Sequence, residues 1–218
     1  MKKFLTILLL IMFVISPRIS LANDSTEKKV DNSLLEESVE KFYRNNFSEV
    51  QDNEGNNVTM LHKSNINKFY ENNEFDKIRD YILENKISLA WYDGISYRAS
   101  LGKSSSKTFY KLYKSTNYGS IQKEWVVKLS GTFYYDQNKK IVTSVGKPTL
   151  SIQVARFGAG FSPYLSNVST SGTKNGSYGA KFSASYNMKA NMNIKQSGVT
   201  IKGIVNFPRD TVSYTSSL

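Results

Sequence analysis

Residues 180–194 alternate without a break between apolar and polar side chains. Successive side chains of a strand point to opposite faces, so this alternation predicts one long strand with an apolar face and a basic, amide-rich face. Turn residues follow at 196–198, and a less regular alternation then continues as far as Phe207. The stretch therefore predicts a two-faced β-hairpin, around which the rest of the chain can be organised.

The residues between Ile87 and this hairpin also follow a period of two. Asp93-Gly94 is typical of a two-residue type I′ turn and predicts a hairpin over residues 87–101. Further strands are predicted at 108–113, 125–135, 141–145, 149–155 and 212–214. Ser-rich or Gly-rich segments at 103–107 and 158–179 predict loops, the second of them long. No helical crossover joins the strands, so we expect an antiparallel β-meander closed as a sandwich or barrel.

Residues 33–87 show helical periodicity instead. Ser33 lies three residues before Glu36, which is the spacing of a capping box, and apolar residues follow at helical intervals. A second helical region is predicted at 66–70 and 74–85. The fold class expected from the sequence is therefore α+β, with short N-terminal helices followed by the antiparallel β-meander.

Residues 1–22 have the features of a secretory signal peptide. Two lysines precede a twelve-residue apolar run, and a small-x-small pattern ends at Ala22. The run is too short to cross a bilayer of ~30 Å as a helix, although Arg18 near the cleavage site keeps an uncleaved anchor as an alternative. We expect a bacterial protein that is secreted, extracellular or cell-wall associated, after cleavage near Ala22-Asn23. The chain has no cysteine, so packing alone must stabilise it.

Charge divides the remaining chain into two parts. Residues 23–87 carry 14 acidic and 9 basic residues, a net charge of −5, and residues 88–218 carry 4 and 17, a net charge of +13. We therefore expect a flexible leader (23–32), an acidic helical region (33–87) and a basic antiparallel β domain (88–218). The basic part favours anionic partners. Alternatively, the acidic part packs against the basic part and cancels much of its field.

Candidate catalytic residues are few. His62 is the only histidine, expected in a loop between helices, and no cysteine is present, which excludes a Cys-His or multi-histidine metal site. Asp93 and Asp136 are explained by turns, so Glu124 and Asp210 are the remaining carboxylates of the β part that could act as a pair on a glycosidic bond. We expect no enzyme, no metal and no cofactor, with a glycan-acting enzyme kept as an alternative. Export argues against nucleic acid as the partner.

Binding is the function that the sequence favours. The polar face of the hairpin carries four lysines interleaved with Ser and Asn: Lys181, Lys189, Lys195 and Lys202. Three tyrosines are expected nearby: Tyr92, Tyr134 and Tyr178. Such a face can hold an anionic cell-wall polymer, a polysaccharide or an acidic lipid surface. Alternatively, these residues have no binding role and are simply the solvated face of a half-buried sheet.

A different reading takes the hairpin over residues 180–207 as a membrane-inserting, pore-forming element. A tilted transmembrane strand needs ~9–11 residues with a lipid-facing apolar row, and both arms are long enough. Three alanines in that row and the misplaced Gly203 and Ile204 count against it. The oligomeric state is left open.

Overall fold

The computed structural model describes residues 32–218 apart from 101, 102 and 120. The expected signal peptide, its cleavage site near Ala22 and nearly all of the expected leader lie outside the described residues. The first described elements are α2 (Ser33–Arg44), β1 (Glu49–Gln51), α3 (Thr59–Glu71) and α4 (Phe75–Asn85). Long strands follow to the end of the chain, which confirms the α+β class with short helices before antiparallel strands.

The strands form two antiparallel sheets. The first, sheet A, has the order β1-β2-β3-β4-β5, and β6 also pairs with β4. Its longer strands are β2 (Ser88–Ser100), β3 (Lys103–Tyr118), β4 (Ile121–Asp136), β5 (Ile141–Val145) and β6 (Thr149–Arg156). The second, sheet B, has the order β7-β8-β9, with β7 (Phe161–Asn175), β8 (Gly179–Gln196) and β9 (Val199–Ser217).

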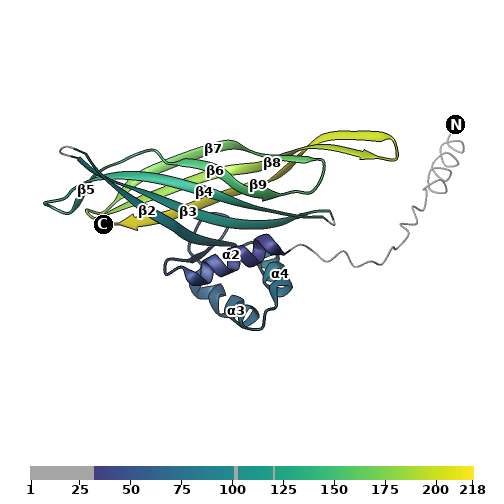
Figure 1. Ribbon diagram of the computed structural model, residues 1–218, viewed down its shortest axis with the longest axis horizontal. Helices are drawn as coiled ribbons and strands as arrows, with labels where there is room; N and C mark the ends of the chain where they lie inside the picture. Colours follow the sequence, from purple (N-terminus) through teal and green to yellow (C-terminus); the bar gives the residue numbers. More distant parts are fainter. Residues whose placement is uncertain (1–31, 101–102, 120) are drawn as a thin grey trace, which may run out of the picture. The chain divides into compact units, whose positions relative to one another are not determined.

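The helices cover one face of sheet A and sheet B covers the other (Figure 1). Alternation along β4 explains this arrangement, because neighbouring side chains enter different cores. Val126 packs in a cluster with residues of the helices, whereas Trp125 and Val127 pack in a second cluster with residues of sheet B. The described chain therefore has three layers: helices, sheet A and sheet B.

The long alternating strand predicted at 180–194 is present as β8. Its even-numbered residues from Ala180 to Ala190 are 0 or 1% exposed and face the core between the sheets. The predicted turn is also present, since Ser197 and Gly198 have φ values of 50° and 81° and connect β8 to β9. Both predictions about the hairpin are confirmed.

Three predictions about local structure are wrong. Asp93-Gly94 is not a turn: β2 continues through it, and the register with β3 shifts between Tyr92 and Gly94, whose φ of 134° suits a β-bulge. The expected long loop at 158–179 is mostly strand β7, which pairs with β8 along almost its whole length. The expected loop at 103–107 likewise belongs to β3. In each case pairing with a long neighbouring strand outweighs the local turn or loop composition.

The two sheets approach each other closely at both edges. On one side the backbone N–H of Thr211 donates to Asn53 O at 2.9 Å, which ties β9 to the segment after β1. On the other side the N–H of Val142 donates to Ser177 O at 2.8 Å, which ties β5 to the turn before β8. The core that the two sheets share and the hydrogen bonds at their edges are compatible with the expected sandwich or barrel. Closure of the sheets into either architecture stays a prediction.

Candidate functional site

The four lysines of the predicted site lie on one face of sheet B, the face turned away from the core. Lys181, Lys189 and Lys195 occupy odd positions of β8, and Lys202 on β9 pairs with the odd-numbered Asn193. Partners across a strand pair point to the same side. Lys189 is half-buried and the other three are exposed. We call these four residues the lysine face.

The lysine face is a stripe and not a pocket. Lys189 lies eight positions after Lys181, which corresponds to about 26 Å along a strand. That distance exceeds the Debye length of about 8 Å at physiological salt, so the two ends act together only on an extended anion or a surface. Lys195 and Lys202 are closer, because Lys195 pairs with Thr200, two residues before Lys202.

Arg209 adds a fifth cation to this face. It pairs with Asn187 on β8, shares its outward direction, and is exposed. The sequence pattern did not reveal it, because a register shift between Asn187 and Lys189 interrupts the alternation of β9 just beside it. The bulge therefore places Arg209 on the lysine face, although strict alternation along β9 would place it on the opposite face.

Negative charge is scarce around the lysine face. From Phe161 to the end of the chain Asp210 is the only acidic residue, and it is buried on the inner side of sheet B. Within the described residues none of the four lysines forms a salt bridge. The acidic helices lie beyond sheet A, and the loop carrying Glu54 meets only the edge of β9, where Ser213 donates to Gly55 O at 2.7 Å. The helices therefore do not cover the cations.

The three tyrosines expected nearby do not form one group with the lysines. Tyr92 is half-buried at the edge of sheet A, and its hydroxyl donates to Thr215 O at 2.6 Å. Tyr178 is 63% exposed in the turn before β8. Tyr134 is exposed on β4, on the face opposite its core neighbour Phe133 and thus away from sheet B. Only Tyr178 belongs to sheet B and its turns.

The two carboxylates considered for catalysis do not converge. Glu124 shares the helix-facing side of β4 with Val126 and accepts a hydrogen bond of 2.9 Å from the Tyr113 hydroxyl. Asp210 lies between the sheets, where its carboxylate is 3.0 Å from Lys114 Nζ. Since β4 separates the two, they cannot flank one scissile bond as a glycosidase requires.

His62 lies inside helix α3, not in the loop expected from the sequence. Its Nδ1 is 3.0 Å from the hydroxyl of Tyr81 on α4, which is a contact within the helical layer. Among residues 32–218, apart from the three positions not described, no three His, Asp or Glu side chains gather as metal ligands would.

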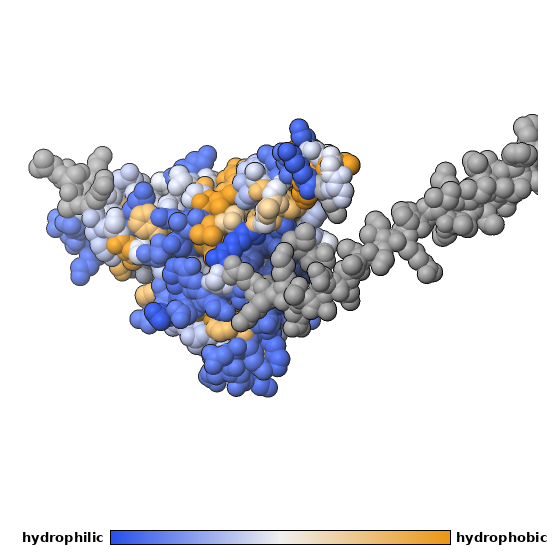
Figure 2. All heavy atoms as spheres, turned by 45° about the vertical axis from the view of Figure 1, so that its right-hand side comes forward, coloured by the Kyte–Doolittle hydropathy of each residue, from blue (hydrophilic) through white to orange (hydrophobic). Residues whose placement is uncertain are grey.

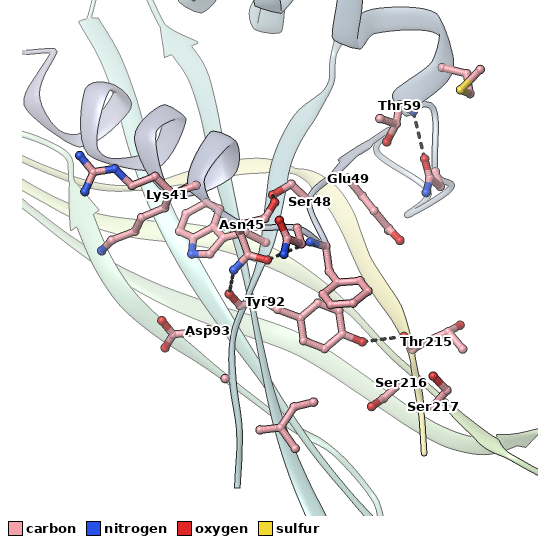
Figure 3. Close-up of a pocket in the computed structure, with 18 residues that line it drawn as sticks. Lys41, Asn45, Ser48, Glu49, Thr59, Tyr92, Asp93, Thr215, Ser216 and Ser217 are labelled. Carbon is pink, nitrogen blue, oxygen red and sulfur yellow. Dashed lines mark hydrogen bonds between the residues drawn. The ribbon is translucent and has the colours of Figure 1, made fainter.

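An open groove of about 1010 Å³ lies where the end of α2 meets β2 and the end of β9 (Figure 3). Asn45 organises it: its side-chain Nδ2 donates to Tyr92 O, and its side-chain Oδ1 accepts the N–H of Phe47 at 3.0 Å. Phe47 is thereby held 70% exposed, with its ring centroid 5.8 Å from that of Tyr92. Trp91 also lines the groove, and its buried Nε1 has no hydrogen-bond partner in the described structure.

The groove offers aromatic surface and hydrogen-bond groups, and its volume is at the upper limit for small-molecule pockets. Lys41 and Arg44 contribute cations to its wall, and Glu49 and Asp93 contribute carboxylates. The sequence does not reveal the groove, because its residues come from four separate segments, and because Asp93-Gly94, where the β-bulge lies, has the composition of a turn.

A smaller cavity of about 300 Å³ contains the buried ion pair. Lys114 and Asp210 line it together with Asn53, whose side-chain oxygen accepts a hydrogen bond from Lys114 Nζ. Burial raises the pKa of Asp210, although the nearby Lys114 acts in the opposite direction. The pair joins β3 to β9 and therefore serves as a polar link between the sheets.

Lys123 is a second buried cation, separate from the lysine face. Its side chain is enclosed by aromatic rings, with Nζ 3.8 Å from the centroid of Phe161, and it donates to Phe157 O. Burial lowers the pKa of this lysine. Its enclosure removes it from any surface that a partner could reach.

Comparison with known proteins gives no assignment. No protein-family model matches the sequence, and neither a curated protein nor a solved structure is significantly similar to it. None of the helices in the described part of the chain has the length and hydrophobicity needed to cross a membrane. The function must therefore be argued from the surfaces described above.

Proposed function

We propose that this chain is a secreted, non-enzymatic binding protein that attaches through its lysine face to an anionic cell-surface or extracellular component. The observation that supports this most directly is the charge of the outer side of sheet B. Four lysines and Arg209 point outward there, and the one carboxylate of the sheet, Asp210, points inward.

The geometry of the lysine face favours an extended partner. Its cations follow a strand over tens of ångströms, so a single small anion cannot reach all of them. Serine, threonine and asparagine occupy the positions between them and supply hydrogen-bond groups without opposing charge. An anionic cell-wall polymer, a polysaccharide or an acidic lipid surface matches this pattern of spaced cations.

The test is retention on isolated bacterial cell envelopes and on anionic vesicles across a salt series. Replacing the four lysines by glutamine (Lys181→Gln, Lys189→Gln, Lys195→Gln, Lys202→Gln) should weaken retention at low salt at least tenfold and flatten its salt dependence. A control variant removes four exposed lysines elsewhere: Lys63→Gln, Lys68→Gln, Lys77→Gln and Lys139→Gln. Equal losses in both variants would show that net charge alone acts, and unchanged retention in the first would refute the assignment of the site.

Two other functions have weaker support. The pore-forming reading requires the apolar row of β8 to face lipid, but that row lies in the core between the sheets from Ala180 to Ala190. The glycan-acting enzyme requires paired carboxylates, and Glu124 and Asp210 lie on different sides of β4. We therefore propose binding as the function, without a catalytic step.

A further inference from the structure

The hairpin formed by β8 and β9 extends beyond the strands that support it. β7 begins at Phe161, which pairs with Met192, so β8 continues past the end of its neighbour. Figure 1 shows the hairpin projecting from the body of the molecule at the end opposite the chain's C-terminus. We call residues 193–204 the hairpin tip.

The hairpin tip exposes large apolar side chains. Val199 is 62% exposed, Ile201 44% and Ile204 58%. Ile201 pairs with Ile194 and continues the apolar row that is buried further along β8, whereas Ile204 pairs with Asn191 on the opposite face. Both faces of the tip therefore present hydrophobic surface to solvent, which is costly unless a partner covers it.

The end of β3 contributes a further exposed aromatic ring at the same end of the molecule. Tyr118, the last residue of β3, is 42% exposed, and its ring centroid lies 6.5 Å from that of Phe207 on β9. In Figure 2, where this end is turned toward the viewer, hydrophobic residues lie directly beside hydrophilic ones on the strand layers. The apolar surface is thus interrupted by polar residues and is not one continuous patch.

Cations lie on the outer face of the tip, which is the face of Ile204 and the one opposite to Val199 and Ile201. Lys202 pairs with Asn193 and Lys195 with Thr200, so both lysines belong to the tip itself, and no acidic residue occurs between Phe161 and Arg209. Lysine can bury its aliphatic stem beside apolar groups while its ammonium group stays at a polar boundary. Apolar residues flanked by lysines are the combination that an interface of anionic lipid accommodates.

We propose that the hairpin tip is a membrane-contact element, which places Val199, Ile201 and Ile204 at the acyl boundary of an anionic bilayer while Lys195 and Lys202 bind lipid phosphates. This inference rests on the proposed function and names its partner as a lipid surface. A soluble anionic polymer would satisfy the lysines but would leave the isoleucines in water. The contact is peripheral, because the rest of β8 remains in the core.

The test compares a lipid partner with a polymer partner. The full chain is sedimented with vesicles of phosphatidylcholine alone, with vesicles containing phosphatidylglycerol, and with an insoluble polyanion such as heparin-agarose. The double variant Val199→Ser with Ile201→Ser should lose at least tenfold in affinity for the anionic vesicles and keep its affinity for heparin-agarose. The control is Val154→Ser with Val168→Ser, which removes two valines exposed elsewhere on the strands, and it should bind all three like the parent.

A spectroscopic readout reports the contact directly. Since the chain has no cysteine, Val199→Cys gives one site for an environment-sensitive dye, and Ser64→Cys on α3, away from the lysine face, gives an exposed control site. Dye at position 199 should shift to shorter wavelength on anionic vesicles, and dye at position 64 should not.

Each other outcome has a separate meaning. Full vesicle binding by the Val199→Ser, Ile201→Ser variant overturns the tip as the contact but leaves the lysine face in place. Salt-insensitive or absent retention of the parent on every anionic material overturns the proposed function itself. Release of a dye trapped inside the vesicles overturns peripheral contact in favour of insertion of the whole hairpin.

Discussion

Lys114 and Asp210 form a buried salt bridge between the two sheets, with Nζ 3.0 Å from a carboxylate oxygen and side chains only 9% and 5% exposed. One residue belongs to β3 and the other to β9, so the pair joins the middle of sheet A to the last strand of the chain. Removing two charges from water is costly, and their attraction offsets that cost only when both are present.

Breaking this pair should destabilise the protein strongly. We expect Lys114→Met or Asp210→Leu alone to lower the free energy of unfolding by about 3–5 kcal/mol, because each leaves an unpaired buried charge. The double variant should cost clearly less than the sum, since it removes both charges. Urea denaturation followed by far-UV circular dichroism measures all three. A loss below about 1 kcal/mol in both single variants would contradict the buried pair.

Tyr214 should make stability depend on alkaline pH. Burial raises its pKa to about 12, so the hydroxyl keeps its proton in the folded protein at pH values where the unfolded chain, with a pKa near 10, has lost it. This contribution to stability is complete below pH 10 and is lost as the pH rises toward 12.

The variant Tyr214→Phe should therefore show a weaker fall in stability between pH 10 and pH 12 than the parent. At neutral pH it should cost about 1 kcal/mol, because the hydrogen bond between the Tyr214 and Thr108 hydroxyls is lost. Urea midpoints measured at half-unit steps of pH give both quantities. Identical slopes in the two proteins would show that the Tyr214 hydroxyl is not buried in solution.

Two strand glycines provide a matched test of how closely the sheets approach. A Cβ added at Gly172 on β7 would lie 2.4 Å from the backbone oxygen of Gly146, whereas one at Gly203 on β9 would meet nothing nearer than Met192 Cε at 3.4 Å. We expect Gly172→Ala to destabilise by about 1–3 kcal/mol through overpacking. Gly203→Ala should be neutral or slightly stabilising. Equal effects, measured by thermal unfolding, would argue against the close edge between β7 and β5.

The sequence predicted the elements whose alternation continues over many residues. β8 was predicted with the correct face inward because every even position from Ala180 to Ile194 is apolar and the opposite face is polar. The helices were predicted for the same reason, although α3 begins at Thr59, earlier than its apolar stripe indicated. Long periodic patterns hold because burial of a whole face favours one register strongly.

Local signals failed where a neighbouring strand decided the structure. Asp93-Gly94 has the composition of a hairpin turn, but the same pair also suits a bulge, and the length of β3 on one side favours continuous pairing. Strand β7 has little alternation, because it is rich in serine and threonine on both faces, and its partner β8 supplies the pattern. Such outcomes depend on tertiary pairing that no short window contains.

The candidate sites divide in the same way. The lysine face was predictable because its four residues belong to one hairpin, whose alternation and turn are both visible in the sequence. The groove beside Tyr92 and the buried pair of Lys114 and Asp210 were not, since each joins segments that lie far apart in the chain. Only the folded arrangement brings these groups together.

The hydrogen bonds between β1 and β9 have a consequence for how the chain reaches this structure. The side chain of Gln51 donates to Ser213 O, and its own oxygen accepts the Ser213 N–H at 3.3 Å, across 162 positions of sequence. Closure of that edge therefore joins an early segment to the last strand, which is a contact of very high contact order. Folding of this kind is slow compared with folding through local contacts, and the core between the two sheets cannot be completed until the last strand has been synthesised.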